Sequence, residues 1–343
     1  MLGKVACDLN ESHMIAMHAP DGFLEAQVAL ATAVIALVFV ALALRVSGRE
    51  LGDRQVPLAG IAAAFIFAAQ MFNFPVAAGT TGHLMGGALA AILLGPWVGS
   101  LVVTVVVVVQ ALLFADGGLT ALGYNVLNMA TVTAFGGWAV FRLMRRFMPR
   151  NAAGVMGATA IAALVSVVLS AAAFSVQWLF GASAEVPFDT VFGAMVGVHV
   201  LIGVGEAIIS ALAVGAVLAA RPDLVTGASD LAAAQLVGGR RVGRRTFVLG
   251  GLFVALVLAT VISQFAVDNP DGLEKVAIDE GFIDSGRDHA LDSIIFSDYA
   301  TSGVGNETLS LAVAGVSGVL ITLLVGLGLI SAARQGRNRV AAS

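Results

Sequence analysis

Long apolar runs dominate the sequence, and short polar segments separate them. A helix needs about 20 mostly apolar residues to cross the hydrocarbon core of a bilayer. Windows of this kind recur nine times and predict nine membrane-spanning helices. They cover residues 27–44, 56–72, 82–94, 98–114, 126–141, 152–180, 188–220, 247–267 and 309–333. The third window is short, and it meets the fourth at Gly95-Pro96-Trp97, a sequence typical of a turn.

The composition agrees with an all-α, polytopic membrane protein. Of the 343 residues, 59% are hydrophobic and 12% are charged, whereas soluble domains average about 25% charged residues. A net charge of −4 provides no basic surface for nucleic acid. The single cysteine, Cys7, excludes an internal disulfide framework and a multi-cysteine metal site. An ordinary soluble enzyme and a nucleic-acid-binding protein are therefore excluded.

The distribution of basic residues predicts how the chain crosses the membrane. If the N-terminus lies outside the cell and every window crosses, 15 of the 18 Lys and Arg residues fall in cytoplasmic loops. These residues form clusters within 45–54, 142–150, 221–245 and 334–339. Such an excess of cytoplasmic positive charge is the usual rule for membrane proteins. We therefore expect a multi-pass protein of the cell (inner) membrane, embedded in the lipid bilayer.

Charged segments divide the chain into parts. The Arg-rich residues 222–245 predict a cytoplasmic linker between a seven-helix domain, residues 17–221, and a two-helix module, residues 246–343. Residues 268–307 carry ten acidic residues and predict a loop outside the cell. This loop fits either a solvated acidic surface or an electrostatic funnel for cations. Residues 1–16 have no signal-peptide apolar stretch, and we expect a leader or a start codon placed too early.

The sequence lacks the motifs of common catalytic sites. A P-loop needs a lysine for the phosphates, but the only lysines are Lys4 and Lys275, which the predicted topology places outside the cell. The sequence contains no G-x-S-x-G and no H-E-x-x-H motif. We therefore expect a protein that is not an enzyme and that binds no ATP itself.

Histidines at the outer ends of the predicted helices are candidate metal ligands. His18 follows Met17, and His83 follows the irregular stretch Phe74–Gly82. If Met17 is the first residue of the mature chain, its amine chelates an ion together with the amide nitrogen and imidazole of His18. This leaves one position in the plane for a second imidazole such as that of His83. Planar nitrogen coordination favours Ni(II) or Cu(II), and Co(II) occupies similar sites. A purely structural role for His83 is an equal alternative.

Further polar residues lie near these histidines or within the predicted helices. His199 and Glu206 are two helical turns apart and face the same side of their helix, which fits an ion pathway or interhelical hydrogen bonding. Asp21 and Thr81 lie beside the two histidine motifs. Polar side chains at the outer ends of the fourth and fifth windows either surround the ligands or cap loops. They are Gln110, Asp116, Asn125 and Asn128.

Several stretches together resemble the CbiM/NikM family, the substrate-capture subunits of energy-coupling factor transporters for cobalt or nickel. In chain order they are Met17–Phe23 (MHAPDGF), Phe74–Gly87 (FPVAAGTTGHLMGG), Leu94–Trp97, Gln110–Gly118, Leu122–Met129 and His199–Glu206. The later Asn269–Glu274 (NPDGLE) resembles the PDGLE domain, a two-span module often fused to such subunits.

The resemblance implies that Ni2+ or Co2+ is the transported substrate and that Met17, His18 and His83 bind it. It also implies a membrane-embedded coupling (T) subunit and two cytoplasmic ATPase subunits as partners. The ion would be captured outside, and toppling of the subunit with ATP hydrolysis by the partners would release it inside. The sixteen residues before Met17 depart from the family pattern.

Other functions stay open from the sequence alone. One is a stand-alone ion channel or proton-coupled carrier that uses His199 and Glu206. Another is a vitamin-specific capture subunit, which predicts an aromatic-lined pocket and no dependence on His18 or His83.

Overall fold

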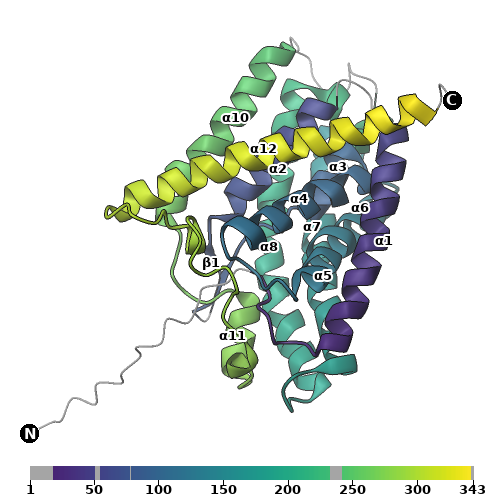
Figure 1. Cartoon of the computed structure of the whole chain (residues 1–343). Coiled ribbons are helices and arrows are strands. Elements are labelled where there is room, and N and C mark those ends of the chain that lie inside the picture. The colour runs from purple at the N-terminus through teal and green to yellow at the C-terminus, as the bar shows by residue number, and fades with distance from the viewer. Residues whose placement is uncertain (1–17, 51–54, 78, 232–241, 341–343) are drawn as a thin grey trace, which may run out of the picture.

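The computed structural model describes residues 18–50, 55–77, 79–231 and 242–340, and helices make up almost all of the regular structure (Figure 1). The predicted all-α, polytopic class is confirmed. Seven helices in this part of the chain are long and apolar enough to cross a membrane. They comprise α1 (Ala26–Glu50), α4 (Pro96–Leu113), the continuous α5, η1 and α6 (Leu122–Asn125, Val126–Val132 and Thr133–Met144), α7 (Ala152–Gly181), α8 (Phe188–Ala220), α10 (Arg244–Thr260) and α12 (Glu307–Val340).

The two remaining predicted windows form shorter helices. Helix α2 (Val56–Gln70) has 15 residues, and α3 (Gly87–Leu94) has 8. At 1.5 Å per residue, α3 extends for only about 12 Å, less than half of the hydrocarbon core. Gly86, with a φ of 76°, precedes the helix. The third predicted window is therefore a half-length helix reached by non-helical chain, because glycines interrupt its first half. All eight residues of α3 are buried within the bundle.

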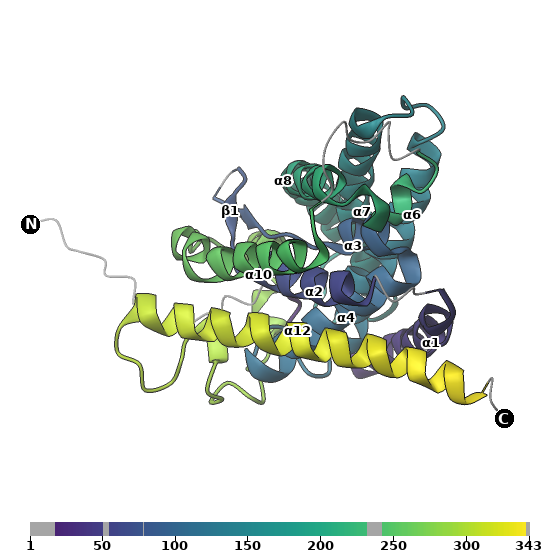
Figure 2. The ribbon, with the colours of Figure 1, turned by 90° about the horizontal axis from the view of Figure 1, so that it is seen from above.

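The helices form a layered bundle. Seen from above, α10 and α12 lie along one side, α6, α7 and α8 lie on the other, and α2, α3 and α4 lie between them (Figure 2). Helices α10 and α12 both pack on α2. Small residues on α2 allow this close approach, since a side chain at Gly60 would collide with Leu327 of α12. The last two long helices thus pack directly against the rest of the bundle.

The predicted linker is partly folded onto the bundle. After α8 the chain makes the 3-10 turns η2 (Pro222–Leu224) and η3 (Thr226–Ala228). Leu224, Val225 and Ala228 are buried in the main apolar core. Arg145, after α6, pairs with Asp230 at 3.2 Å. The rest of the linker, residues 232–241, lies outside the described residues.

Two small elements bring distant parts of the chain together near one end of the bundle. Strands β1 (Phe74–Pro75) and β2 (Thr81–Gly82) form an antiparallel hairpin between α2 and α3. Helix α11 (Gly272–Asp279) lies in the acidic segment between α10 and α12, and it packs on α8. The chain just before α11 contacts β2, because the backbone N–H of Thr81 donates to the carbonyl of Pro270 at 2.9 Å.

Candidate metal site

His18 lies in the segment that leads into α1, and two side chains of α5 hold this segment in place. The amide of Asn125 donates to the carbonyl of Ala19 at 2.9 Å, and the hydroxyl of Tyr124 donates to the carbonyl of Pro20 at 2.8 Å. The carboxylate of Asp21 accepts backbone N–H groups of the turn that precedes α5. These donors are Leu119, Thr120 and Ala121. The segment after His18 is therefore bound along its length.

A glycine-rich loop surrounds His18 on its other side. Gly117 has a φ of 84°, and a Cβ atom there would lie 2.7 Å from Cβ of His18, so only glycine fits without displacement. The preceding residue, Asp116, accepts the backbone N–H of His18 at 3.2 Å. The second oxygen of Asp116 accepts the hydroxyl of Tyr299 at 2.6 Å, and Gln110 donates to that hydroxyl. A chain of hydrogen bonds thus fixes the position of His18.

His83 lies between the hairpin and α3, on a stretch of backbone that Glu206 holds. The two carboxylate oxygens of Glu206 accept the N–H groups of Met85 and Gly86 at 2.7 and 2.9 Å. The Nδ1 atom of His83 lies 3.2 Å from the carbonyl oxygen of Leu84. Because a carbonyl only accepts hydrogen bonds, Nδ1 carries the proton of the neutral ring. The Nε2 atom then carries a lone pair, which is the form that binds a metal ion.

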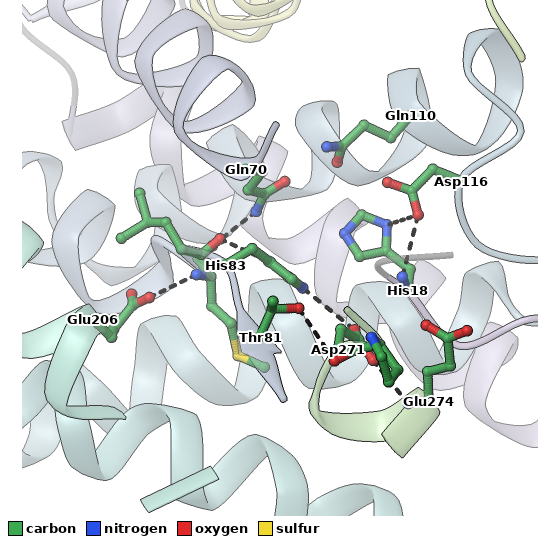
Figure 3. A network of polar contacts seen from close by, with 12 residues as sticks. His18, Gln70, Thr81, His83, Gln110, Asp116, Glu206, Asp271 and Glu274 are labelled. Atoms are coloured by element: carbon green, nitrogen blue, oxygen red, sulfur yellow. Dashed lines mark hydrogen bonds and ion pairs between the residues drawn. The ribbon is translucent and has the colours of Figure 1, made fainter. Parts of the chain in front are cut away.

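The segment that resembles the PDGLE motif approaches His83 directly. The hydroxyl of Thr81 donates to the carbonyl of Asn269 at 2.8 Å and fixes this segment against the hairpin. Asp271 is the N-cap residue of α11, and its Oδ1 atom accepts the N–H of Glu274 at 2.8 Å. Its other oxygen, Oδ2, lies 3.8 Å from Nε2 of His83 (Figure 3). The carboxylate is 5% exposed, so this contact is buried.

These segments line a small cavity of about 60 Å3. His18 and His83 are 3% and 6% exposed, and their ring centroids lie 5.7 Å apart. Neither ring nitrogen of His18 makes a hydrogen bond within the described residues, but Nδ1 lies 3.6 Å from Oδ1 of Asp116. Buried polar atoms normally have a hydrogen-bond partner, so Nε2 points to a position for a ligand. The other polar residues that line the cavity are Asn125, Asn128, Ser170, His199 and Asp271.

Burial governs the charge of the titratable groups around the cavity. It raises the pKa of Asp271 to about 7, and the nearby charge of Asp116 adds to this effect. Burial also lowers the pKa of His18, although the carboxylate of Asp116 opposes the shift. An empty cavity therefore holds little net positive charge to repel a cation. Tyr299 stays a neutral donor because burial and Asp116 raise its pKa well above the usual value.

The π-helical turn η1 brings a further side chain into the cavity. Single π turns inside α-helices widen the backbone and are frequent at functional sites. Asn128 lies in this turn, and its side chain exchanges two hydrogen bonds with Gln177 of α7, at 2.9 and 2.7 Å. The pair orients the amide of Asn128 at the wall of the cavity.

The structure brings some of the candidate residues together and assigns others to the scaffold. His18, His83, Asn125, Asn128 and His199 line the cavity. The remaining candidates contact backbone or residues behind the cavity; they are Asp21, Thr81, Gln110 and Glu206. Met17 lies outside the described residues. Among the described residues, no group of three His, Cys, Asp or Glu side chains is close enough to hold an ion unaided.

Two residues of the acidic segment were not predicted to belong to the site. They are Asp271 and Tyr299, which contact the surroundings of His83 and His18. The spacing of Asp271 and Glu274 matches the capping box that starts many helices and was the available sequence signal for α11. An open depression of about 1,130 Å3 adjoins Tyr299. Its acidic lining residues are Asp268, Asp288, Asp292, Asp298 and Glu307.

Two buried imidazoles at a small cavity within a polytopic helical bundle define a membrane protein with a candidate site for a transition-metal ion. Residues 18–224 match the family model described as the cobalt uptake substrate-specific transmembrane region (CbiM). Residues 245–335 match the PDGLE domain. The chain therefore belongs to the CbiM family and carries a PDGLE domain after the transmembrane region.

Similar proteins of known description are metal-transport proteins. A candidate fused nickel transport protein, NikMN, from Archaeoglobus fulgidus is 34% identical over 322 residues, which are 93% of this chain and 99% of the relative. The cobalt transport protein CbiM of Geobacter sulfurreducens is 31% identical over 80% of each chain. The crystal structure of a truncated transition metal transporter has a TM-score of 0.52 and 31% identity, and the match covers 59% of this chain and 98% of that one.

Proposed function

We propose that this chain is the substrate-binding membrane subunit of an energy-coupling factor importer for Ni2+ or Co2+. The observation that carries the proposal is the buried cavity at which His18 and His83 meet, with ring centroids 5.7 Å apart. Imidazole nitrogen suits both ions. The relatives described as nickel and cobalt transport proteins support the same substrate class.

The size of the cavity favours an ion over an organic substrate. Small-molecule pockets typically have about 300–1,000 Å3, whereas this cavity has about 60 Å3. An ion that has lost most of its water fits this volume, and a vitamin does not. The polar groups that line the cavity would replace the lost hydration.

His18 and His83 would supply the imidazole ligands. Nε2 of His83 is the metal-binding atom because Nδ1 bonds to the carbonyl of Leu84. The family resemblance adds the amide nitrogen of His18 and the amine of Met17, and both ligands stay predictions. The amide must lose its proton to bind an ion, and Asp116 already accepts that N–H at 3.2 Å.

The polar groups on α8 support capture rather than conduction along this helix. Glu206 uses both carboxylate oxygens to hold Met85 and Gly86. His199 lines the cavity, but its Nδ1 atom bonds to the carbonyl of Met195 at 2.7 Å. A channel or proton-coupled carrier would need these groups to exchange ions or protons, whereas here they hold neighbouring backbone groups.

The partners and the orientation are part of the same proposal. Along α1, His18 precedes the first turn and Arg45 lies near the last, so the cavity and this arginine are at opposite ends. Helix α6 likewise ends at Arg142 and Arg145. The positive-inside rule then has the cavity face the outside of the cell. Because the sequence has no P-loop, energy for import would come from ATPase subunits joined through a coupling subunit.

Binding of nickel to the purified full chain tests the proposal. We expect His83→Ala to weaken Ni2+ binding by at least about 100-fold in calorimetry, because a direct ligand costs no less than an outer-shell partner. His289→Ala removes a buried histidine outside the cavity and should leave the affinity unchanged. Equal affinities of His83→Ala and the unaltered chain, or no Ni2+ and no Co2+ binding by the unaltered chain, would contradict the proposal. For the partners, metal uptake by cells should require co-expressed ATPases with intact Walker lysines.

A further inference from the structure

Asp271 and His83 face each other at a separation that two ligands of one ion would have. Nε2 of His83 and Oδ2 of Asp271 lie 3.8 Å apart, too far for a hydrogen bond. Two atoms that each lie about 2.1 Å from one ion are separated by about 3.0 Å at a right angle and about 4.2 Å when opposite. The observed separation falls between these limits. Both atoms are electron-pair donors in the neutral-imidazole and carboxylate forms, so a cation between them would be attracted by both.

The position of Asp271 is fixed by contacts of its own. Its Oδ1 atom caps α11 through the N–H of Glu274, which leaves Oδ2 directed at His83. The preceding residues are bound to Thr81, two positions before His83, by hydrogen bonds of 2.8 and 2.9 Å. Gly272 allows the close approach, because a Cβ atom there would lie 2.5 Å from Ile202 and 3.1 Å from His199. The carboxylate and the imidazole are thus held by one rigid junction.

The opposite wall of the cavity supplies the second observation. His18 is 3% exposed, and both of its ring nitrogens are buried without hydrogen-bond partners within the described residues. His18, His83 and Asp271 all line the same cavity. Nδ1 of His18 lies 3.6 Å from Asp116, so Nε2 is the ring atom that fits a ligand, and the carboxylate of Asp271 lines the same cavity.

We propose that Asp271, from the PDGLE domain, donates a carboxylate oxygen to the captured divalent cation and closes the cavity over it. This inference rests on the proposed function, and it adds a ligand from outside the transmembrane region that matches CbiM. The proposed nitrogen ligands include one anion, the deprotonated amide of His18, so they would leave a divalent ion with a net positive charge in a buried cavity. One carboxylate lowers that net charge, which reduces the cost of removing the ion from water.

Asp271→Asn in the full chain tests the inference. Asparagine keeps the helix cap and nearly the shape of aspartate but loses the charged oxygen. We expect calorimetric affinity for Ni2+ and Co2+ to fall at least about tenfold, as for other groups around bound metals. We also expect the ligand-field spectrum of bound Co2+ to change, because a coordinating atom is replaced. Asp279→Asn, on the exposed side of the same helix, is the matched control and should bind as the unaltered chain does.

The possible outcomes separate this inference from the proposed function. Unchanged affinity of Asp271→Asn, with binding lost in His83→Ala, would overturn the role of Asp271 and leave capture intact. Weaker affinity with an unchanged Co2+ spectrum would also overturn it, since Asp271 would then act through charge or folding alone. Absence of binding in the unaltered chain would overturn the proposed function itself. Thermal unfolding of each variant verifies folding, and Asp271→His, which offers another ligand atom, should bind more tightly than Asp271→Ala.

Discussion

Replacing Asp21 by alanine should weaken metal capture although its carboxylate does not line the cavity. Asp21 accepts four hydrogen bonds, from the backbone of Leu119, Thr120 and Ala121 and from the hydroxyl of Thr120. A hydrogen bond to a charged group contributes about 1.5–3 kcal/mol net. Asp21 is only half-buried, so water would satisfy part of what is lost, and we expect a total of about 2–3 kcal/mol.

This energy holds the segment that positions His18. Without these hydrogen bonds, the binding of the ion must itself order the segment that carries His18. A cost of about 2–3 kcal/mol then corresponds to roughly 30- to 150-fold weaker affinity for the ion. Calorimetry with Ni2+ measures the change, and thermal unfolding should show a loss of a few degrees. Asp21→Asn keeps an acceptor oxygen and should lose less. Glu25→Gln, an exposed carboxylate four residues later, is the control. An Asp21→Ala variant with full affinity would refute the idea that this carboxylate positions His18.

Two further substitutions probe the backbone around the histidines. Gly117→Ala should weaken Ni2+ binding at least about tenfold in calorimetry, because the new side chain would have a φ of 84° and a Cβ atom 2.7 Å from His18. Gly79→Ala is the control, since Gly79 has a similar φ of 74° but no neighbour within 4 Å. Equal losses of affinity in the two variants would contradict a specific contact between residue 117 and His18. Glu206→Gln should destabilise the protein by about 1.5–3 kcal/mol in thermal unfolding, since a charged acceptor of two buried N–H groups is lost. Glu185→Gln, at an exposed position, is the control and should leave the stability unchanged. Normal stability of Glu206→Gln together with a loss of transport would favour a role of Glu206 in an ion path.

The helices could be predicted from the sequence because membrane-spanning segments follow from apolar length alone. The predicted window 188–220 coincides with α8, and 152–180 differs from α7 by one residue. The window 82–94 was less informative, because composition does not reveal where a helix starts inside an apolar segment. Gly86 and the two N–H groups bound by Glu206 decide that start, and Glu206 is 120 residues away from Gly86. Such long-range contacts leave no periodic signal.

The histidines could be predicted because they lie in motifs that are unusual in membrane helices. His18 and His83 were both expected near one end of the bundle, and the structure has their rings 5.7 Å apart. The role expected for Glu206 as part of a pathway or second shell rested on helical periodicity alone. Periodicity assigns a face of the helix but not the partner on that face, which here is the backbone before α3.

The place of the acidic segment could not be predicted from its composition. Ten acidic residues indicate a solvated loop, and most of them are solvated, but Asp271 is buried at the cavity. The difference lies in the local sequence around it. Asn269 and Pro270 offer carbonyl oxygens to Thr81, Gly272 permits close packing against α8, and the N–H of Glu274 donates to Asp271 at the start of α11. Composition averages over these residues, whereas each of them acts through one contact.

The junction between the two parts of the chain has a consequence for how an ion is held. Contacts from the PDGLE domain reach both histidines: Asp271 faces His83, and Tyr299 bonds to Asp116 beside His18. A movement of the segment that carries α11 would withdraw the carboxylate while leaving the imidazoles on the bundle. Affinity would then depend on whether this segment is docked, because removing one charged oxygen from a buried dication raises its free energy. If Asp271 binds the ion as proposed, docking of the PDGLE domain would hold the ion during capture, and undocking would weaken its binding before release.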